Sequence, residues 1–162
     1  MYGLITGIIV SVFYLVLYIA NLSFKPGWQY VAYIPFVVGI FMNAIAYSKA
    51  NDHYVTFGNV FSSGFKASAV IAIISVVWAI LMTVIFPEMK DKAIEMIQEQ
   101  AESRPGVSEE QIEMSLNITR KYWTVFMVAG AMFGTLFWGA VFSLIGALIA
   151  KRKGERPPSV MA

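Results

Sequence analysis

Four stretches of this chain contain no Asp, Glu, Lys or Arg, and each is long enough to cross a lipid bilayer as a helix. They are 21 to 29 residues long, whereas about 20 helical residues cover the roughly 30 Å of hydrocarbon in a bilayer. The stretches are Met1–Phe24, Pro26–Ser48, Ala67–Pro87 and Tyr122–Ala150. In lipid every backbone N–H and C=O must be satisfied within the chain, so we expect each stretch to be a helix. The sequence therefore predicts an integral membrane protein.

The composition supports this class and excludes several others. Hydrophobic residues make up 58% of the chain and charged residues 14%, while soluble domains are about 45–50% apolar. The strict alternation of a transmembrane β-barrel is absent. The net charge of +2 is too small to indicate a nucleic-acid partner. The absence of cysteine excludes disulfides and thiolate metal sites.

We expect an all-α fold: one integral membrane domain over 1–162, built as a four-transmembrane-helix bundle with an extramembrane helical hairpin. The first helix is expected to be an uncleaved span rather than a secretory signal, because it lacks a basic start and three spans follow it. The predicted spans are about 2–22, 28–47, 65–86 and 122–150, and the charged hairpin occupies 87–121.

Three local features refine this prediction. Pro26 and Gly27 predict a turn between the first two spans, and Pro35 predicts a kink in the second. In the link 48–66, aromatic residues recur every three or four positions, which favours a short helix lying on the membrane surface. These residues are Tyr54, Phe57, Phe61 and Phe65.

The stretch between the third and fourth spans holds eight of the ten acidic residues. One apolar helical face precedes Arg104-Pro105-Gly106, which interrupts the helix. Ser108 followed by Gln111 then predicts a capping box at the start of a second helix. The stretch 87–121 is therefore expected to form two helical arms beyond the membrane. The tail from Lys151 onward is expected to be loose.

Lys and Arg are equally numerous on the two sides of the predicted spans. Lys151-Arg152-Lys153 directly follows the last span, so the positive-inside rule favours cytoplasmic termini and an outside hairpin. Arg120 and Lys121, at the other end of that span, oppose this orientation.

Small residues at four-residue spacing predict close helix packing. Gly3, Gly7 and Ser11 form one row in the first span. The last span has two rows, which start at Gly130 with Gly134 and at Gly139 with Ser143. All could pack within one bundle. Alternatively, one of the two rows in the last span could bind a partner protein.

Catalytic motifs are missing from the chain, and we expect no catalytic residue, no metal site and no cofactor. His53 is the only histidine, so a histidine pair for zinc is impossible. Apart from Lys66 at the start of the third span, no span carries an acidic or basic side chain, which argues against an ion-coupled transporter. Asn43 is the most polar residue at membrane depth, where it makes an interhelical hydrogen bond or contacts a substrate.

Short motifs resemble a known family. Tyr2-Gly3-Leu4-Ile5 with Gly7, Thr56-Phe57-Gly58 and Gly64-Phe65, followed by the charged stretch before the last span, are similar to the domain of unknown function 4199 family of small bacterial inner-membrane proteins. The resemblance covers nearly the whole chain and implies location in the inner membrane. It implies no established activity, cofactor or catalytic residue.

The leading functional hypothesis is a non-enzymatic accessory or scaffold component of an envelope system. Its expected partners are the lipid bilayer and another membrane protein, or a second copy of the chain, through the small-residue faces; nucleic acid is not expected. The alternative is a small transporter or lipid-binding membrane protein with a cleft beside Asn43 and the aromatic link.

Overall fold

A computed structural model describes residues 1–25, 27–31, 33–103 and 106–155. Pro26 and the Arg104-Pro105 part of the predicted interruption lie outside the described residues. Within the described ranges every element is a helix, so the predicted all-α class is confirmed. The helices are α1 (Tyr2–Ile19), α2 (Trp28–Val31), α3 (Ile34–Ala50), α4 (Phe57–Ile85), α5 (Glu88–Glu102), α6 (Glu109–Lys121) and α7 (Trp123–Ile149).

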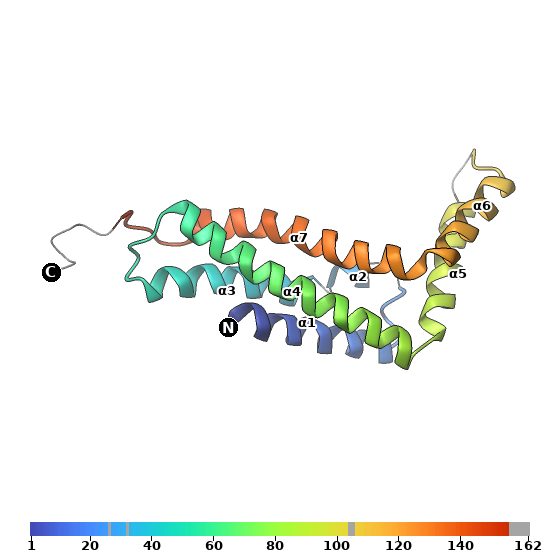
Figure 1. Cartoon of the computed structure of the whole chain (residues 1–162), viewed down its shortest axis with the longest axis horizontal. Helices are drawn as coiled ribbons and strands as arrows, with labels where there is room; N and C mark the ends of the chain where they lie inside the picture. Colours follow the sequence, from blue (N-terminus) through green and yellow to red (C-terminus); the bar gives the residue numbers. More distant parts are fainter. Residues whose placement is uncertain (26, 32, 104–105, 156–162) are drawn as a thin grey trace.

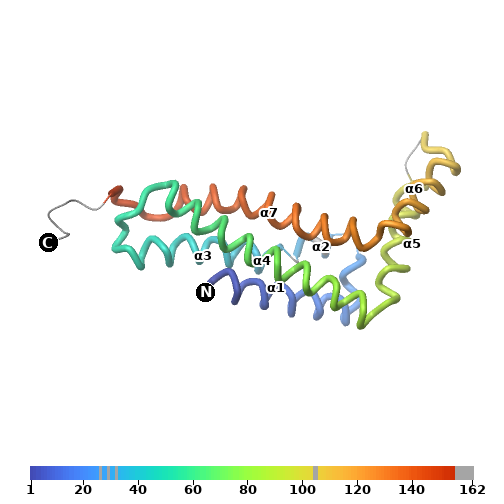
Figure 2. Tube along the Cα trace, in the orientation of Figure 1, coloured from blue at the N-terminus to red at the C-terminus, as the bar shows by residue number. Residues whose placement is uncertain are grey.

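The two longest helices, α4 and α7, run side by side in opposite directions and form the backbone of the fold (Figures 1 and 2). The two shorter apolar helices, α1 and α3, pack along different halves of this pair. Helix α3 packs on both α4 and α7 in the half away from α5 and α6, whereas α1 packs on α4 and α3 in the other half. The N-terminus therefore lies about midway along the bundle rather than at its end (Figure 1).

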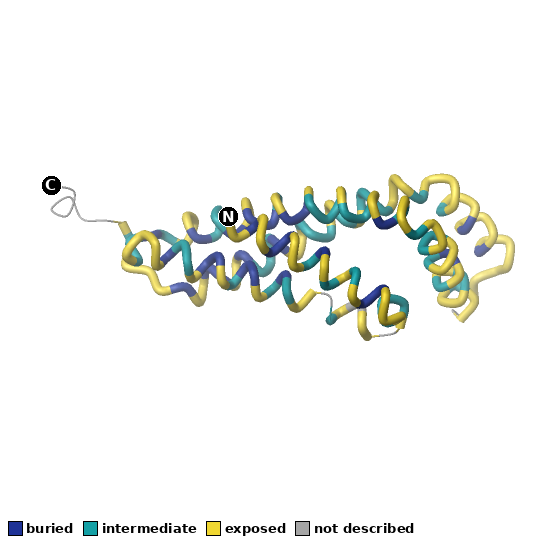
Figure 3. Tube along the Cα trace, turned by 90° about the horizontal axis from the view of Figure 1, so that it is seen from below, coloured by how far each residue is buried: buried dark blue, intermediate teal, exposed yellow. Residues whose placement is uncertain are grey.

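Three helices, α1, α4 and α7, are long and apolar enough to cross a membrane. Helix α3 is a shorter apolar helix of 17 residues, which corresponds to about 26 Å. Exposed residues, yellow in Figure 3, recur along the whole bundle, and many of them on these helices are large and apolar. Ile73, Val84 and Phe133 are 64%, 74% and 71% exposed. Such surfaces fit a lipid environment, because apolar atoms in contact with water would be destabilising.

The second predicted span differs from the observed helices. The sequence indicated one helix over 28–47 with a kink at Pro35, but α2 and α3 are separate, and α3 continues to Ala50. Pro35 lies in the first turn of α3. There its missing N–H breaks no intrahelical bond, and its ring clashes with any helix continuing from the preceding residues. Proline therefore starts this helix instead of bending it.

The prediction of a separate surface helix in the link 48–66 was wrong. Helix α4 begins at Phe57 and runs unbroken to Ile85. The Thr56 hydroxyl caps it by accepting a hydrogen bond from the backbone N–H of Asn59, at 3.3 Å. The recurring phenylalanines lie in the first turns of this long helix, where the Phe61 ring stacks on those of Phe57 and Phe65.

Helices α5 and α6 pack on each other at one end of the bundle (Figure 1). Their small core consists of Ile94, Ile112 and Leu116. The predicted capping box is confirmed: the Ser108 hydroxyl accepts from the Gln111 N–H, and the Gln111 side chain accepts from the Ser108 N–H. These reciprocal bonds start α6 after the turn and fold the chain back toward α7.

The beginning of the tail is anchored rather than loose. The Ser48 hydroxyl donates to the carbonyl of Lys151, and the Lys153 N–H donates to the carbonyl of His53 at 2.7 Å. Because that hydroxyl has a single proton, its 2.9 Å contact with Nδ1 of His53 requires the imidazole to be the donor. The ammonium of Lys153 also lies 5.0 Å from the ring centroid of Tyr54. The α3–α4 link therefore holds the basic residues that follow α7.

Candidate functional site

A gap in the helix packing creates an apolar cavity in the described part of the structure. Helix α1 packs against α4 and α3 but has no extensive contact with α7. The half of the bundle next to α5 consequently lacks one of the helix–helix contacts that would close a four-helix bundle. The space between α1, α4 and α7 stays open, and α5 covers its end.

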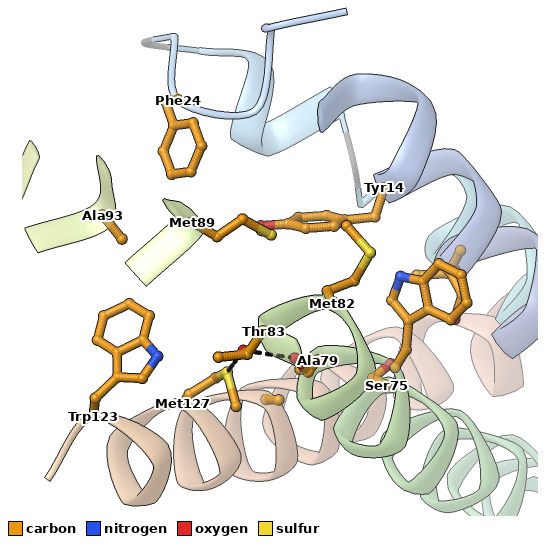
Figure 4. Close-up of a pocket in the computed structure, with 14 residues that line it drawn as sticks. Tyr14, Phe24, Ser75, Ala79, Met82, Thr83, Met89, Ala93, Trp123 and Met127 are labelled. Atoms are coloured by element: carbon orange, nitrogen blue, oxygen red, sulfur yellow. Dashed lines mark hydrogen bonds between the residues drawn. The ribbon is translucent and has the colours of Figure 1, made fainter. Parts of the chain in front are cut away.

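This cavity has two adjoining lobes of about 340 and 380 Å³, within the range of small-molecule sites. The lobes share Val10, Tyr14, Phe24, Ser75 and Ala93. Figure 4 shows the first lobe, with side chains from α1, α4, α5 and α7 arranged around a common space. Neither lobe is lined by an acidic or basic side chain, so the cavity can hold only a molecule, or a part of one, without net charge.

Methionines and aromatic rings form much of the lining. Met82, Met89 and Met127 line the first lobe from three different helices, and Met96 lines the second. In Figure 4 the Tyr14 ring extends from α1 toward Met89 on α5, across the space between them. Methionine is unbranched and flexible, so such a lining adapts to the shape of an apolar occupant.

Three buried polar atoms without a hydrogen-bond partner belong to residues that line the cavity. They are Nε1 of Trp78, Nε1 of Trp123 and Oγ of Ser23. Among the described residues, the only other buried side-chain N or O atom without a partner is Oγ of Ser143. An unsatisfied buried donor costs about 1–3 kcal/mol, so the two indole N–H groups favour any occupant that carries an acceptor.

Two other hydroxyl groups at the cavity, those of Ser11 and Thr83, already have acceptors in the protein. The Ser11 hydroxyl donates to the carbonyl of Gly7 at 2.8 Å. The Thr83 hydroxyl lies 2.9 Å from the carbonyl of Ala79 and 3.2 Å from the sulfur of Met127 (Figure 4). A hydroxyl has one proton, so these groups add little donor capacity toward an occupant.

Helix α5 covers the end of the cavity, and contacts with Tyr18 hold this helix in place. The Tyr18 hydroxyl donates to Oε1 of Glu88 at 2.9 Å. The ring centroids of Tyr18 and Phe86 are 4.9 Å apart. The ammonium of Lys92 lies 5.8 Å from the same Tyr18 ring. The pKa of Glu88 is lowered, because its own backbone N–H and the Tyr18 hydroxyl both donate to the carboxylate. The carboxylate therefore remains an acceptor for Tyr18 at neutral pH.

Most of the predicted packing residues lie against α4. A Cβ atom added to Gly3 would lie 2.8 Å from the carbonyl oxygen of Ala67. Gly7 faces Ile74, Gly139 faces Ser68, and Ser143 faces Gly64. Ser11 is buried on α1. Small side chains at these positions bring the backbones of α1, α4 and α7 close together.

Gly130 and Gly134 are different. A Cβ atom added to either glycine would have no described atom within 4 Å. Bundle packing thus accounts for the row from Gly139 onward, while the row with Gly130 and Gly134 has no neighbour among the described residues.

Asn43 lies outside the cavity. Its side-chain Nδ2 donates to Oγ of Ser63 at 3.2 Å, which links α3 to α4. Two roles were considered for Asn43, an interhelical hydrogen bond and a substrate contact. The structure shows the hydrogen bond. The cleft that we expected beside it is a shallow surface region lined by Tyr47, Asn59 and Lys66, among others.

Sequence reasoning missed the cavity and its two tryptophans. At the end of a predicted span, Trp123 fits an aromatic belt at the membrane boundary, whereas Trp78 lies inside a span. A tryptophan inside a span, such as Trp78, has an N–H group that needs a partner in an apolar environment. This was the available signal, but the missing partners depend on how the helices pack.

A comparison with protein families covers every residue that lines the cavity. A family model described as "Protein of unknown function (DUF4199)" matches residues 1–152. The chain belongs to this family. The resemblance seen in the short sequence motifs is thereby confirmed, and every residue that lines the cavity falls within the matched range of the DUF4199 model. Neither the curated proteins nor the solved structures contain a match.

Proposed function

We propose that this protein is a non-enzymatic membrane protein that binds an apolar, chain-like molecule of the bilayer in the cavity between α1, α4, α5 and α7. The observation that carries this proposal is the uncharged lining of the two lobes, together with the lack of extensive contact between α1 and α7. In a bilayer such a space fills with lipid chains, since water would find few polar partners there. This extends the lipid-binding alternative but moves the site away from Asn43.

Filling the cavity tests this function. Ala131 lines the first lobe from α7, so Ala131→Phe places a ring in the space. Val125 lies on the same helix and is 61% exposed, so Val125→Phe adds the same ring outside. In native mass spectrometry after purification in mild detergent, we expect the unmodified chain and Val125→Phe to retain lipid and Ala131→Phe to lose it. Equal retention by both variants, or an unmodified chain without lipid, would contradict the proposal.

We also propose an accessory role through the uncovered face of α7 at Gly130 and Gly134. Small residues without a neighbour in the chain support it, because they allow another helix to approach closely. The partner is a second copy or another membrane protein. Since the chain has no cysteine, Gly134→Cys can form a disulfide only with another chain. A disulfide-linked dimer in native membranes, absent for Ile73→Cys on the outer face of α4, would support self-association; equal dimer yields would argue against it.

The membrane arrangement that we propose has four crossings in a bacterial inner membrane, with both termini in the cytoplasm and α5–α6 outside. Helix α3, at about 26 Å, is close to the hydrocarbon thickness, and α2 precedes it. Lys151, Arg152 and Lys153 at the end of α7 favour the cytoplasm. Labelling of Glu113→Cys by a membrane-impermeant reagent in spheroplasts, without prior lysis, is expected. Labelling only after lysis would reverse the orientation.

A further inference from the structure

The cavity also indicates which chemical group its occupant carries, an inference that rests on the proposed lipid-binding function. Its lining offers two indole N–H groups without partners, those of Trp78 and Trp123. An indole N–H is a donor only. The complementary group on a bound molecule is therefore an acceptor such as a carbonyl oxygen, and a plain hydrocarbon chain would leave both donors unsatisfied.

The two tryptophans lie at different depths. Trp123 is the first residue of α7, next to the α5–α6 end of the bundle. Thr83 on α4 contacts Met127 on α7, and because the helices are antiparallel, Trp78 is level with about Ala131. A rise of 1.5 Å per residue places Trp78 about 12 Å deeper than Trp123. A single acceptor therefore cannot serve both N–H groups.

Trp123 is the donor near the boundary of the apolar spans. Figure 4 shows its indole nitrogen on the side of the ring that faces Thr83 and Met127. In a glycerolipid the ester carbonyls join the hydrocarbon chains to the headgroup, at the level where tryptophan side chains gather in membrane proteins. The uncharged lining below this level suits the acyl chain, and it excludes the charged headgroup.

We propose that the cavity binds a glycerolipid whose ester carbonyl accepts a hydrogen bond from Nε1 of Trp123, while the acyl chain enters the lobe lined by Met82, Met89 and Met127. The headgroup stays outside the lobe, beyond Trp123. Recognition of the ester carbonyl distinguishes an acyl lipid from one with ether-linked chains, because an ether-linked lipid with the same headgroup and chains has no carbonyl oxygen.

The test is a competition between diester and diether phosphatidylglycerol with identical chains. The purified full-length protein is equilibrated with an equal mixture of the two lipids in detergent micelles, and the bound lipid is identified by native mass spectrometry. From the usual net strength of one hydrogen bond, we expect about a two- to tenfold excess of bound diester lipid. Trp123→Phe should bind the same total amount of lipid without this excess. Trp138→Phe, a matched control on α7 that lines neither lobe and is 43% exposed, should keep the excess.

Each other outcome counts against one specific claim. Lipid bound to the unmodified protein in equal amounts of ester and ether overturns the ester proposal but leaves the lipid-binding function intact. No bound lipid of either kind overturns the proposed function itself. A preserved ester excess in Trp123→Phe overturns the role of Trp123. If Trp123→Phe fails to fold, benzothienylalanine at position 123 removes only the N–H group and keeps the ring shape; the excess must disappear in that protein too.

Discussion

The hydroxyl of Tyr18 donates a 2.9 Å hydrogen bond to Oε1 of Glu88, and this contact joins the end of α1 to the first residue of α5. It connects positions 70 residues apart in the chain. Because α5 contributes Met89, Ala93 and Met96 to the cavity lining, this bond sets where the cover of the cavity sits.

The first prediction concerns the pH dependence of this cover. The pKa of Glu88 lies below its ordinary value of 4.5, so the carboxylate stabilises the docked state above pH 4.5. This contribution is lost only as the pH falls through the lowered pKa of the folded state. Spin labels at Ala20→Cys and Glu99→Cys should keep one distance from pH 7 to 4.5 and separate below it. In a Glu88→Gln background that acid-induced step should vanish; its persistence would assign the step to another acid.

The second prediction compares two glycines of α7. The position of a Cβ atom at Gly139 is occupied by the Ser68 side chain, whereas the one at Gly134 is open. Gly139→Ala should therefore lower the unfolding free energy by about 1–3 kcal/mol through overpacking. Gly134→Ala should leave the stability unchanged or raise it by up to about 1 kcal/mol. Thermal unfolding in one detergent measures both, and similar losses would show that α7 packs differently.

The third prediction separates Asn43 from the lipid site. Asn43→Leu removes the hydrogen bond to Ser63, which should cost about 0.6 to 1.7 kcal/mol of stability. Lipid retention should stay at the level of the unmodified chain, because Asn43 does not line either lobe. Native mass spectrometry measures the amount of retained lipid. Loss of bound lipid in a folded Asn43→Leu protein would return the site to the α3–α4 side.

The fourth prediction addresses the anchored residues after α7. Ser48→Ala removes the hydroxyl that joins His53 to the carbonyl of Lys151. Trypsin should then cleave after Lys151, Arg152 and Lys153 several times faster, since cleavage follows local opening. Asn51→Ala is the matched control, because its side chain bonds to Tyr47 within the end of α3. Unchanged cleavage in Ser48→Ala would mean that other contacts hold these residues.

Much of the helical structure could be predicted from local signals. Uncharged runs located α1 and α7, and the Ser108–Gln111 pattern located the start of α6. The failures also have local causes. A Thr56 cap starts α4 early and merges the aromatic link into it, and a proline at the start of a helix was mistaken for a kink within one.

Local sequence signals of this kind could not predict the cavity. Four-residue spacing shows that Gly134 and Gly139 suit close packing, but it does not say which of them has a neighbour. Gly139 faces Ser68 on α4, whereas Gly134, five residues earlier, lies about 140° around the helix from it and has no neighbour. Helix α1 has its extensive contacts with α4 and α3 rather than with α7, which leaves the space between α1 and α7 open. A single sequence carries no local signal for which helices an apolar helix packs against.

Photochemical capture of the occupant tests the central claim most directly. Benzoylphenylalanine replaces Tyr14, which lines both lobes, or Ile8, which is 51% exposed on the same helix. Both proteins are purified in detergent, irradiated and weighed by mass spectrometry. The account predicts an adduct with the mass of a membrane lipid at position 14 and a detergent adduct at position 8. Detergent adducts at both positions, or a cross-link from position 14 into α7 without added mass, would contradict a lipid-filled cavity.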